Sequence, residues 1–344
     1  MTSSTLQTIK VHDQGARDQL SVMIQQQEKY YRCEDYLHAH ELEPIEAHDP
    51  LHVVTQCAML VTDVPSPAPS SPAGIWQRYS NSSVRSPSTV SKFPRTSSNN
   101  FHHAAIQEHG METSSWRSSE SMFRKSQLSA SEAESLVEWR RQMIDWSYSL
   151  VDMYELDREV VAVAFHLLDR YVASEVLSAE NYSEAPFDRD DFQLYGIVCL
   201  SIAIKALVPF RKLTVECIIE MSRGFYTKEH ITEAELEILG VLDWHVNQPT
   251  VMDFCRLYLD LFPNSLNEDM VHASCQYLAE VALDDVYFIS KPASLVALSA
   301  VLLATQRFGA SCDEIQGFLQ NLQGLISVHT SEFDGLFRRL ETLS

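Results

Sequence analysis

The stretch DDFQLYGIVCLSIAIKALV, at residues 190–208, decides the fold class of this chain. It opens on Asp190 and Asp191, and acids suit the positive N-terminal end of a helix. The residues that follow are apolar at nearly every position. A helix that is apolar on almost all sides has to be contacted on most sides by other elements. We therefore predict that this segment is the middle helix of an all-α bundle.

Helical periodicity extends outward from this segment to residue 131 on one side and to the end of the chain on the other. Apolar residues recur at intervals of three and four, and no segment alternates as a strand does. Before the middle helix we expect a helix at 131–154, opened by a Ser131–Glu134 cap, and a second one capped by Asp157. After it we expect two shorter helices, at 214–224 and 228–244.

The same layout is repeated after a break at Gln248–Pro249. Five helical segments of similar lengths follow the break, and the third of them is again the most apolar. These segments are 249–262, 268–285, 291–308, 312–324 and 331–343. We therefore predict two tandem five-helix bundles, at residues 131–247 and 248–344.

The first 130 residues differ in composition from the rest. Residues 1–62 form an N-terminal extension in which we expect one helix, over 16–38, with an incomplete apolar stripe. Residues 63–130 are rich in Ser, Pro and Asn, and too few branched apolar residues remain there to offset the entropy of ordering. We therefore predict that this second stretch is a disordered linker.

Two regulatory motifs fall in this N-terminal region. Ser66, Ser71 and Ser86 each precede a proline, as the targets of proline-directed kinases do. Such dipeptides are also common in any Ser/Pro-rich tract. Arg17 and Leu20 fit the minimal Arg-x-x-Leu form of a destruction signal, a pattern that often arises by chance.

The charge of the chain bears on its partners. It has 47 acidic and 26 basic residues among 344, a formal charge of -21. Nucleic-acid binding depends on Lys and Arg that neutralise phosphates, so we expect no nucleic-acid partner and instead a partner with a basic surface. The N-terminus lacks an apolar signal core and no run of 18 apolar residues exists, so we expect no secretion and no membrane span.

The sequence offers no recognisable catalytic constellation. It has no Gly-rich phosphate loop, no His-Glu-x-x-His and no Gly-x-Ser-x-Gly. The seven cysteines are scattered and never form Cys-x-x-Cys, which favours reduced thiols, and the 13 histidines lack ligand spacing. We therefore expect no metal, no cofactor and no enzyme, but a binding protein.

Three charged residues interrupt the apolar patterns. Lys205 lies within the apolar run of the middle helix, so its ammonium must reach solvent, pair with a carboxylate or face a partner. Arg140 and Asp169 interrupt the patterns of the first two helices. An ion pair between them is the simplest explanation, because burying either charge alone is very costly.

Several short motifs in the right order are together similar to those of the cyclin family. WRRQMIDW at 139–146 resembles the opening of the cyclin box, and LLDRY at 167–171 resembles its second helix. Residues 192–205 resemble the third helix, and residues 226–235 the start of the fifth. The resemblance is good over 132–247 and weaker beyond, and it implies the tandem five-helix fold. A segment within residues 23–37 is also similar to one upstream of the box in the enlarged cyclin group of diatoms.

The resemblance implies a regulatory subunit that binds and activates a cyclin-dependent Ser/Thr protein kinase in cell-cycle control, in the nucleus and shared with the cytoplasm. It assigns Arg140 and Asp169 to the family's buried structural ion pair. It assigns Lys205 and Glu235 to the contact with the kinase's mobile regulatory helix. That contact holds the kinase helix inward, so that its Glu pairs with the Lys on the third strand.

The resemblance also implies a docking patch for Arg-x-Leu substrates or inhibitors. Its residues here are Trp139, Met143, Trp146 and Gln193. Trp139 replaces a methionine of the family pattern and Gln142 replaces an aliphatic residue, which puts docking in question. Residues 206–208, Ala-Leu-Val, stand where cell-cycle cyclins have an aromatic residue and two acids, which indicates a weaker or rearranged contact, or an atypical kinase.

Two rival functions share the expected fold. A transcription-factor core would bind DNA and should be basic with a zinc-binding N-terminus, whereas this chain is acidic and has no paired cysteines. A cyclin-box scaffold or transcription-linked protein that activates no kinase remains open, since the missing acids after Lys205 suit it. Co-purification of a kinase separates the scaffold from the kinase activator.

Overall fold

The apolar run at residues 190–208 forms helix α6, Arg189–Leu207, in the computed structural model of the chain. The structure describes residues 3–37, 128–178, 187–210, 215–263, 268–326 and 330–344, all of which belong to one compact unit. Every regular element within these ranges is a helix, so the all-α prediction is confirmed. The predicted linker and its serines Ser66, Ser71 and Ser86 lie outside the described residues.

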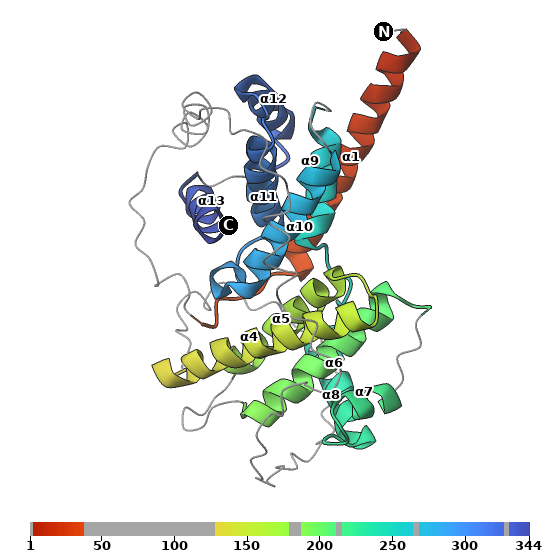
Figure 1. The fold of residues 1–344 in the computed structure, drawn as a ribbon, viewed down its shortest axis with the longest axis vertical. Coiled ribbons are helices and arrows are strands. Elements are labelled where there is room, and N and C mark those ends of the chain that lie inside the picture. The colour runs from red at the N-terminus through yellow and green to blue at the C-terminus, as the bar shows by residue number, and fades with distance from the viewer. Residues whose placement is uncertain (1–2, 38–127, 179–186, 211–214, 264–267, 327–329) are drawn as a thin grey trace, which may run out of the picture. The chain divides into compact units, whose positions relative to one another are not determined.

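The first bundle is built around α6 (Figure 1). Its other helices, each packed against α6, are α4 (Ala130–Met153), α5 (Glu159–Ser178), α7 (Val215–Met221) and α8 (Lys228–Val241). Nearly every residue of α6 from Phe192 to Ile204 is buried, as expected for a helix that is apolar on all sides. Gly196 lets α4 approach closely, because a Cβ there would lie 2.9 Å from the Cε of Met143.

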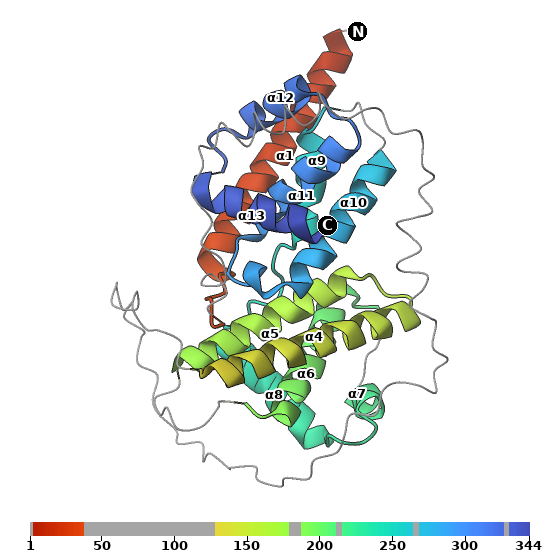
Figure 2. The same ribbon diagram turned by 60° about the vertical axis from the view of Figure 1, so that its left-hand side comes forward.

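The second bundle repeats this plan around α11, Ala293–Arg307, which is buried from Ser294 to Thr305. It packs against α9 (Val251–Leu261), α10 (Glu268–Asp284) and α13 (Thr330–Leu343), and α12 (Cys312–Leu322) completes the bundle (Figure 2). The short 3₁₀ helix η4, Val286–Phe288, follows α10. In both bundles the third helix is therefore the centre, as the hydropathy pattern predicted.

The start of α4 corrects one prediction. The capping box is made by Ser129 and Glu132, not by Ser131 and Glu134. Two Ser-x-x-Glu patterns overlap here, and the structure uses the earlier one: the Ser129 N–H donates to Glu132 at 2.8 Å, and the Glu132 N–H donates to the Ser129 hydroxyl. Asp157 does cap the next helix, because its carboxylate accepts the N–H of Glu159 at 2.9 Å.

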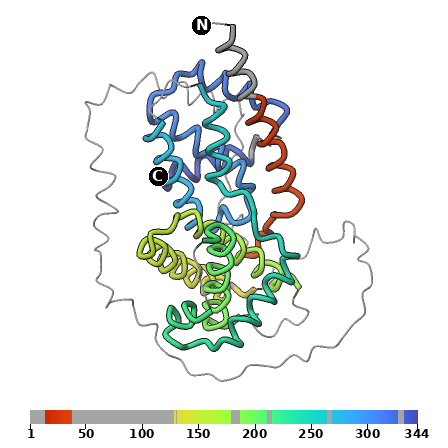
Figure 3. The backbone as a smooth tube through the Cα atoms, turned by 90° about the vertical axis from the view of Figure 1, so that its right-hand side faces the viewer, coloured from red at the N-terminus to blue at the C-terminus, as the bar shows by residue number. Residues whose placement is uncertain are grey.

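The N-terminal helix α1 runs Ser3–Tyr30, so it begins earlier and ends earlier than the expected 16–38. Its apolar residues Ala16, Leu20, Met23 and Ile24 lie at the spacing of one helix face and pack on the second bundle, chiefly beside α9 (Figure 3). The stripe looks incomplete in the sequence because only one side of α1 is covered.

After α1 the chain leaves the helix and crosses to the first bundle. The Tyr31 carbonyl faces the Nε2 of His166 at 3.0 Å, and the Tyr31 hydroxyl donates to the Asn247 carbonyl at 3.0 Å. Cys33 and Tyr36 then enter the core of the first bundle. Residues 16–37, which we call the N-terminal strap, therefore contribute side chains to both cores.

The Arg-x-x-Leu motif lies within the strap. Leu20 is fully buried, and the Arg17 guanidinium donates to the carbonyl of Asn321. At the other end of α1, Gln27 makes two hydrogen bonds with Ser294 at the start of α11. Its Nε2 donates to the Ser294 hydroxyl at 3.1 Å, and its Oε1 accepts the Ser294 N–H at 2.9 Å. In this fold the motif residues hold α1 on the second bundle.

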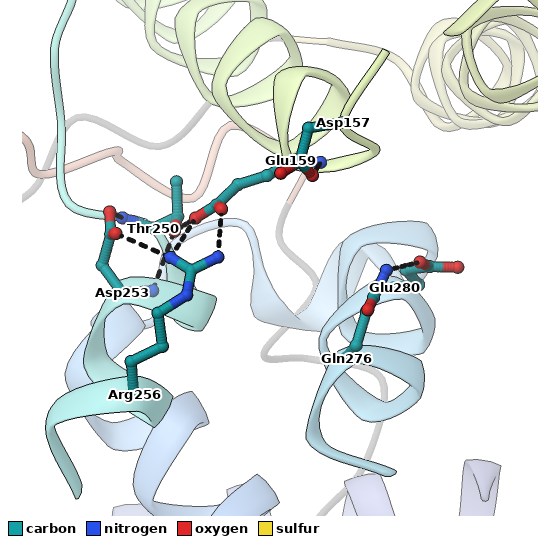
Figure 4. Close-up of polar contacts among 7 residues, drawn as sticks. All are labelled: Asp157, Glu159, Thr250, Asp253, Arg256, Gln276 and Glu280. Carbon is teal, nitrogen blue, oxygen red and sulfur yellow. Dashed lines mark hydrogen bonds and ion pairs between the residues drawn. The ribbon is translucent and has the colours of Figure 1, made fainter. Parts of the chain in front are cut away.

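Ion pairs fasten the two bundles to each other (Figure 4). Arg256 of α9 contacts Glu159 of α5 at 2.6 Å and Asp253 at 3.0 Å. The Thr250 hydroxyl also donates to Glu159. Nearby, Arg158 contacts Glu280 of α10 at 2.8 Å. These charged hydrogen bonds are directional and help to fix the orientation of the bundles. Apolar residues also join the bundles, because Leu283, Val286 and Ile289 pack on the core of the first one.

Within the described ranges, no helix is both long enough and apolar enough to cross a membrane.

The strap generates a stability prediction. Replacing Leu20 by Ala should lower the free energy of unfolding by about 2–5 kcal/mol, because the change leaves a cavity in the second core. The exposed neighbour Val22, changed to Ala, should stay within about 0.5 kcal/mol of the wild type. Urea denaturation followed by circular dichroism measures both. Equal effects at the two positions would show that α1 does not pack on the second bundle.

Candidate functional site

Lys205 and Glu235 meet on the surface of the first bundle. Lys205 lies in the last turn of α6 and Glu235 in the middle of α8, and their Nζ and Oε1 atoms are 2.6 Å apart. The side chains keep 38% and 23% of their surface exposed. The sequence left three roles open for Lys205, and the structure shows that it pairs with a carboxylate while remaining accessible. A position near the helix C-terminus favours its positive charge further.

Exposed apolar residues lie close to this pair in the sequence. Leu207 and Phe210 follow Lys205 along the chain, and Leu236 follows Glu235 on α8. Phe210 is 96% exposed and Leu236 is 60% exposed. We call Lys205, Leu207, Phe210, Glu235 and Leu236 the α6–α8 face. Large apolar side chains around a partly exposed ion pair are typical of a protein–protein contact rather than of a small-molecule pocket.

The face owes its geometry to the packing below it. Ile231, Ala234 and Ile238 form the buried side of α8, and Ile202 and Ile204 lie on buried sides of α6. Glu235 follows Ala234 directly, so it stands at the border between the buried side of α8 and solvent. Apolar packing therefore sets the distance between the helices, and the ion pair spans it.

Arg140 and Asp169 form a second ion pair, which is buried. The guanidinium donates two parallel hydrogen bonds to the carboxylate, Nε to Oδ1 at 2.9 Å and Nη2 to Oδ2 at 2.8 Å. Their side chains are only 2% and 5% exposed. Arg140 also donates to the Leu283 carbonyl of α10 at 2.8 Å, and Tyr36 of the strap donates to Asp169 at 3.0 Å. The pair thus joins α4, α5, α10 and the strap.

Charges in this cluster shift the pKa of its members. Burial by itself lowers the pKa of Arg140, but the Asp169 carboxylate outweighs burial and leaves the pKa above its ordinary value. Burial, and then the Asp169 charge, raise the pKa of Tyr36 well above its usual range. Arg140 therefore stays charged and Tyr36 stays protonated at neutral pH, and the cluster acts as a structural link.

The predicted docking patch is only partly accessible. Trp139, Trp146 and Gln193 are half-buried, and the Trp139 ring packs beside Phe192 at 6.0 Å between centroids. Met143 is buried against α6 and presents no surface to a partner.

Gln142 gives this region a polar character. It accepts a hydrogen bond from Arg189 at 2.9 Å and donates one to Glu138 at 2.6 Å. The substitution of Gln for an aliphatic residue therefore places a hydrogen-bonded network beside the two tryptophans.

The junction between the bundles holds a partly open pocket of about 200 Å³. Its walls include Arg158, Glu159, Arg256 and Glu280, which are paired with one another across the junction. Among the described residues, no group of three His, Cys, Asp or Glu side chains is placed to hold a metal ion.

His166 stands where the strap meets α5. Its Nε2 faces the Tyr31 carbonyl at 3.0 Å, so the neutral ring with a proton on Nε2 donates this bond. Desolvation of the ring, and next the positive charge of Arg170, lower the pKa of His166 to about 4. Sequence patterns did not single out this residue, because its partner is a backbone atom 135 residues away.

Comparison with known proteins places both bundles in one family. Residues 111–247 match the family "Cyclin, N-terminal domain" and residues 249–344 match "Cyclin, C-terminal domain". A viral cyclin from herpesvirus saimiri has a similar structure, with a TM-score of 0.47 and 19% identity, covering 60% of this chain and 84% of that one.

Named relatives are similar over about half of the chain. The G1/S-specific cyclin CCN1 of Candida albicans is 28% identical over 49% of this chain and 26% of its own length. Cyclin-A1-4 of Oryza sativa is 28% identical over 48% of this chain and 44% of its own length. G1/S-specific cyclin-D1 of Homo sapiens is 26% identical over 50% of this chain and 55% of its own length. The matched region thus spans a quarter to about half of these relatives' lengths.

The buried pair generates a prediction on folding. Asp169→Asn should destabilise the chain by about 3–5 kcal/mol, because it leaves the Arg140 charge buried without a carboxylate. Arg141→Ala, which breaks the exposed pair with Glu138, should cost less than about 1 kcal/mol. The double variant Arg140→Met/Asp169→Leu should be more stable than Asp169→Asn alone. Guanidinium denaturation of the four proteins tests this, and an Asp169→Asn loss no larger than that of Arg141→Ala would contradict it.

His166 generates a prediction on pH. Its pKa is lowered in the folded state from about 6.5 to about 4, so the stability it contributes is present above pH 6.5 and is lost as the pH falls through this window. The slope should reach at most about 1.4 kcal/mol per pH unit. His166→Gln keeps an N–H donor for Tyr31 but does not titrate, so its stability should fall less steeply between pH 6.5 and 4. Parallel curves for the two proteins would contradict the assignment.

Proposed function

The chain belongs to the cyclin family, and on that basis we propose that it binds and activates a cyclin-dependent Ser/Thr protein kinase in cell-cycle control. A regulatory role follows from the family. The kinase, its activation and the cell-cycle setting are our proposal, supported by the named G1/S, A-type and D-type relatives. We propose further that the chain works in the nucleus and is shared with the cytoplasm.

The observation that carries the proposal is the α6–α8 face. Lys205 and Glu235 are the two residues that the family resemblance assigns to the kinase, and they come from separate helices to stand 2.6 Å apart. Phe210 and Leu236 supply apolar area that has no cover within the described part of the chain. A kinase helix laid on this face would bury the apolar residues and exchange hydrogen bonds with the lysine and the glutamate.

The mechanism is a shift in the kinase's conformational population. A kinase whose regulatory helix is mobile spends little time with that helix inward, and a partner that binds only the inward state raises its population by its differential affinity. With the helix inward, the kinase's Glu pairs with its strand Lys and completes the phosphate-positioning site. The kinase keeps the chemistry, and the chain contributes binding energy.

The contact here should differ from that of typical cell-cycle cyclins. Ala206, Leu207 and Val208 stand where the family pattern has an aromatic residue and two acids, so the chain has fewer acids after Lys205. The remaining charge of the chain is strongly negative, which favours approach to a basic kinase surface and raises the association rate at low salt.

We also propose a modified docking site for Arg-x-Leu substrates or inhibitors. Trp139, Trp146 and Gln193 are accessible enough to contact a peptide, whereas Met143 is not. Gln142 and Glu138 would offer acceptors to a basic peptide residue. The proposal includes no contact with nucleic acid or membrane, in keeping with the acidic charge.

The test is capture of kinases from lysate with four forms of the tagged chain. Lys205→Ala/Glu235→Ala should recover less than about a tenth of the kinase that wild type recovers, because two charged contacts are lost. The charge swap Lys205→Glu/Glu235→Lys keeps the pair within the chain but reverses both charges, and should also fail. Arg141→Ala breaks an exposed pair elsewhere on the first bundle and should bind as wild type.

The eluates are then assayed for phosphorylation of a histone-type substrate. An active kinase in the wild-type and Arg141→Ala eluates alone supports the proposal. Equal recovery by all four forms would mean that a kinase binds through another surface. If no form recovers a kinase while circular dichroism shows all of them folded, a scaffold that activates no kinase replaces the proposal.

A further inference from the structure

We propose that Glu237, bound by Tyr171 and Tyr195, is a positioning residue that locks the rotation of α8 and so keeps Glu235 within reach of Lys205. This extends the proposed function, because it says how the α6–α8 face retains its shape when a partner engages it. Glu237 itself lies outside that face, and the family resemblance gives it no role.

The geometry is a two-armed hydrogen bond. The Tyr171 hydroxyl, from α5, donates to Oε1 of Glu237 at 2.7 Å. The Tyr195 hydroxyl, from α6, donates to Oε2 at 3.0 Å. Each carboxylate oxygen thus accepts one hydroxyl, and each hydroxyl comes from a different helix. One side chain of α8 is therefore fixed to two neighbouring helices at once.

The two tyrosines are themselves held in place. Their ring centroids lie 4.6 Å apart, and the ring of Phe187 packs beside both, at 6.0 Å from Tyr171 and 5.8 Å from Tyr195. Tyr171 is almost fully buried. Burial, chiefly, raises the pKa of both hydroxyls above the ordinary value, so they remain protonated donors at neutral pH.

Glu235 and Glu237 act on opposite sides of α8. Residues two positions apart are separated by about 200° around an α-helix, so their side chains leave in nearly opposite directions. One carboxylate meets Lys205, and the other meets the tyrosine pair. The buried residues Ala234 and Ile238 lie between them on the inner side. A helix fastened on both flanks resists rotation about its own axis.

A partner that binds Lys205 or Glu235 competes with their ion pair. Competition for these residues opens the first fastening, and without a second one α8 would be less restrained against a turn that carries Leu236 away from the contact. The Glu237 fastening does not compete with the partner. It keeps α8 in register during association and so prolongs the life of the complex.

The test uses Tyr171→Phe/Tyr195→Phe, which removes both hydroxyls and keeps both rings. In the free chain, the unfolding equilibrium constant is measured for Lys205→Ala, Glu235→Ala and the double variant. The coupling factor is the ratio between the effect of the double variant on this constant and the product of the two single effects. It should be about two to five in the wild-type background. The factor should fall to about one in the double-Phe background. Tyr226→Phe is the matched control: it removes a hydroxyl that donates to the Asp190 carbonyl on α6, and should leave the factor unchanged.

A second readout is the dissociation rate of the kinase recovered by the wild-type chain. The double-Phe protein should release it about tenfold faster, and Tyr226→Phe should release it at the wild-type rate. Glu237→Gln, which retains one carbonyl acceptor, should lie between. It also supplies a readout in case the double-Phe protein does not fold.

The outcomes separate this inference from the proposed function. If no kinase binds the wild type, the kinase proposal fails, and the coupling factor in the free chain still decides the role of Glu237. An unchanged coupling factor in both the double-Phe and the Glu237→Gln proteins would overturn the inference. So would an equal loss of coupling in Tyr226→Phe, because it would reduce the effect to general destabilisation.

Discussion

The buried ion pair between Arg140 and Asp169 is the contact on which the rest of the fold depends. Burying either charge alone would be strongly destabilising, so each residue depends on the other. Once paired, they hold α4 on α5, and their remaining hydrogen-bonding capacity reaches the Leu283 carbonyl in the second bundle and Tyr36 of the strap. One interaction therefore fixes four separate parts of the chain relative to one another.

The buried pair and the α6–α8 face are connected through α5. Tyr171 follows Asp169 by two residues, and its hydroxyl holds Glu237 of α8. Glu237 in turn lies two residues after Glu235, which we propose contacts the kinase. Apolar packing around α6 sets the spacing of the helices, and these polar contacts set their rotation. An apolar core alone would give compactness without a fixed register, which a binding face made of two helices requires.

Much of this could be predicted from the sequence, and the limits have a physical cause. The apolar run of α6 gave the all-α class and the bundle plan, because burial on every side is visible in hydropathy. Lys205, Glu235, Arg140 and Asp169 were found because charges interrupt apolar patterns or match family motifs. The Glu237–tyrosine contact, the Tyr36–Asp169 bond and the His166–Tyr31 bond escaped, since hydrogen bonds between distant residues leave no periodic signal. The choice of Ser129 over Ser131, and the bounds of α1, depended on packing that composition does not encode.

The most direct test of the central claim is a titration of a purified cyclin-dependent kinase, identified by capture, with the purified chain. The measured quantity is the rate of phosphate transfer to a histone-type substrate. The account predicts that the chain alone transfers none, and that the kinase rate rises with chain concentration and saturates at one chain per kinase. A rate that stays constant while the chain is folded and bound to the kinase would contradict the claim that binding at the α6–α8 face activates the enzyme.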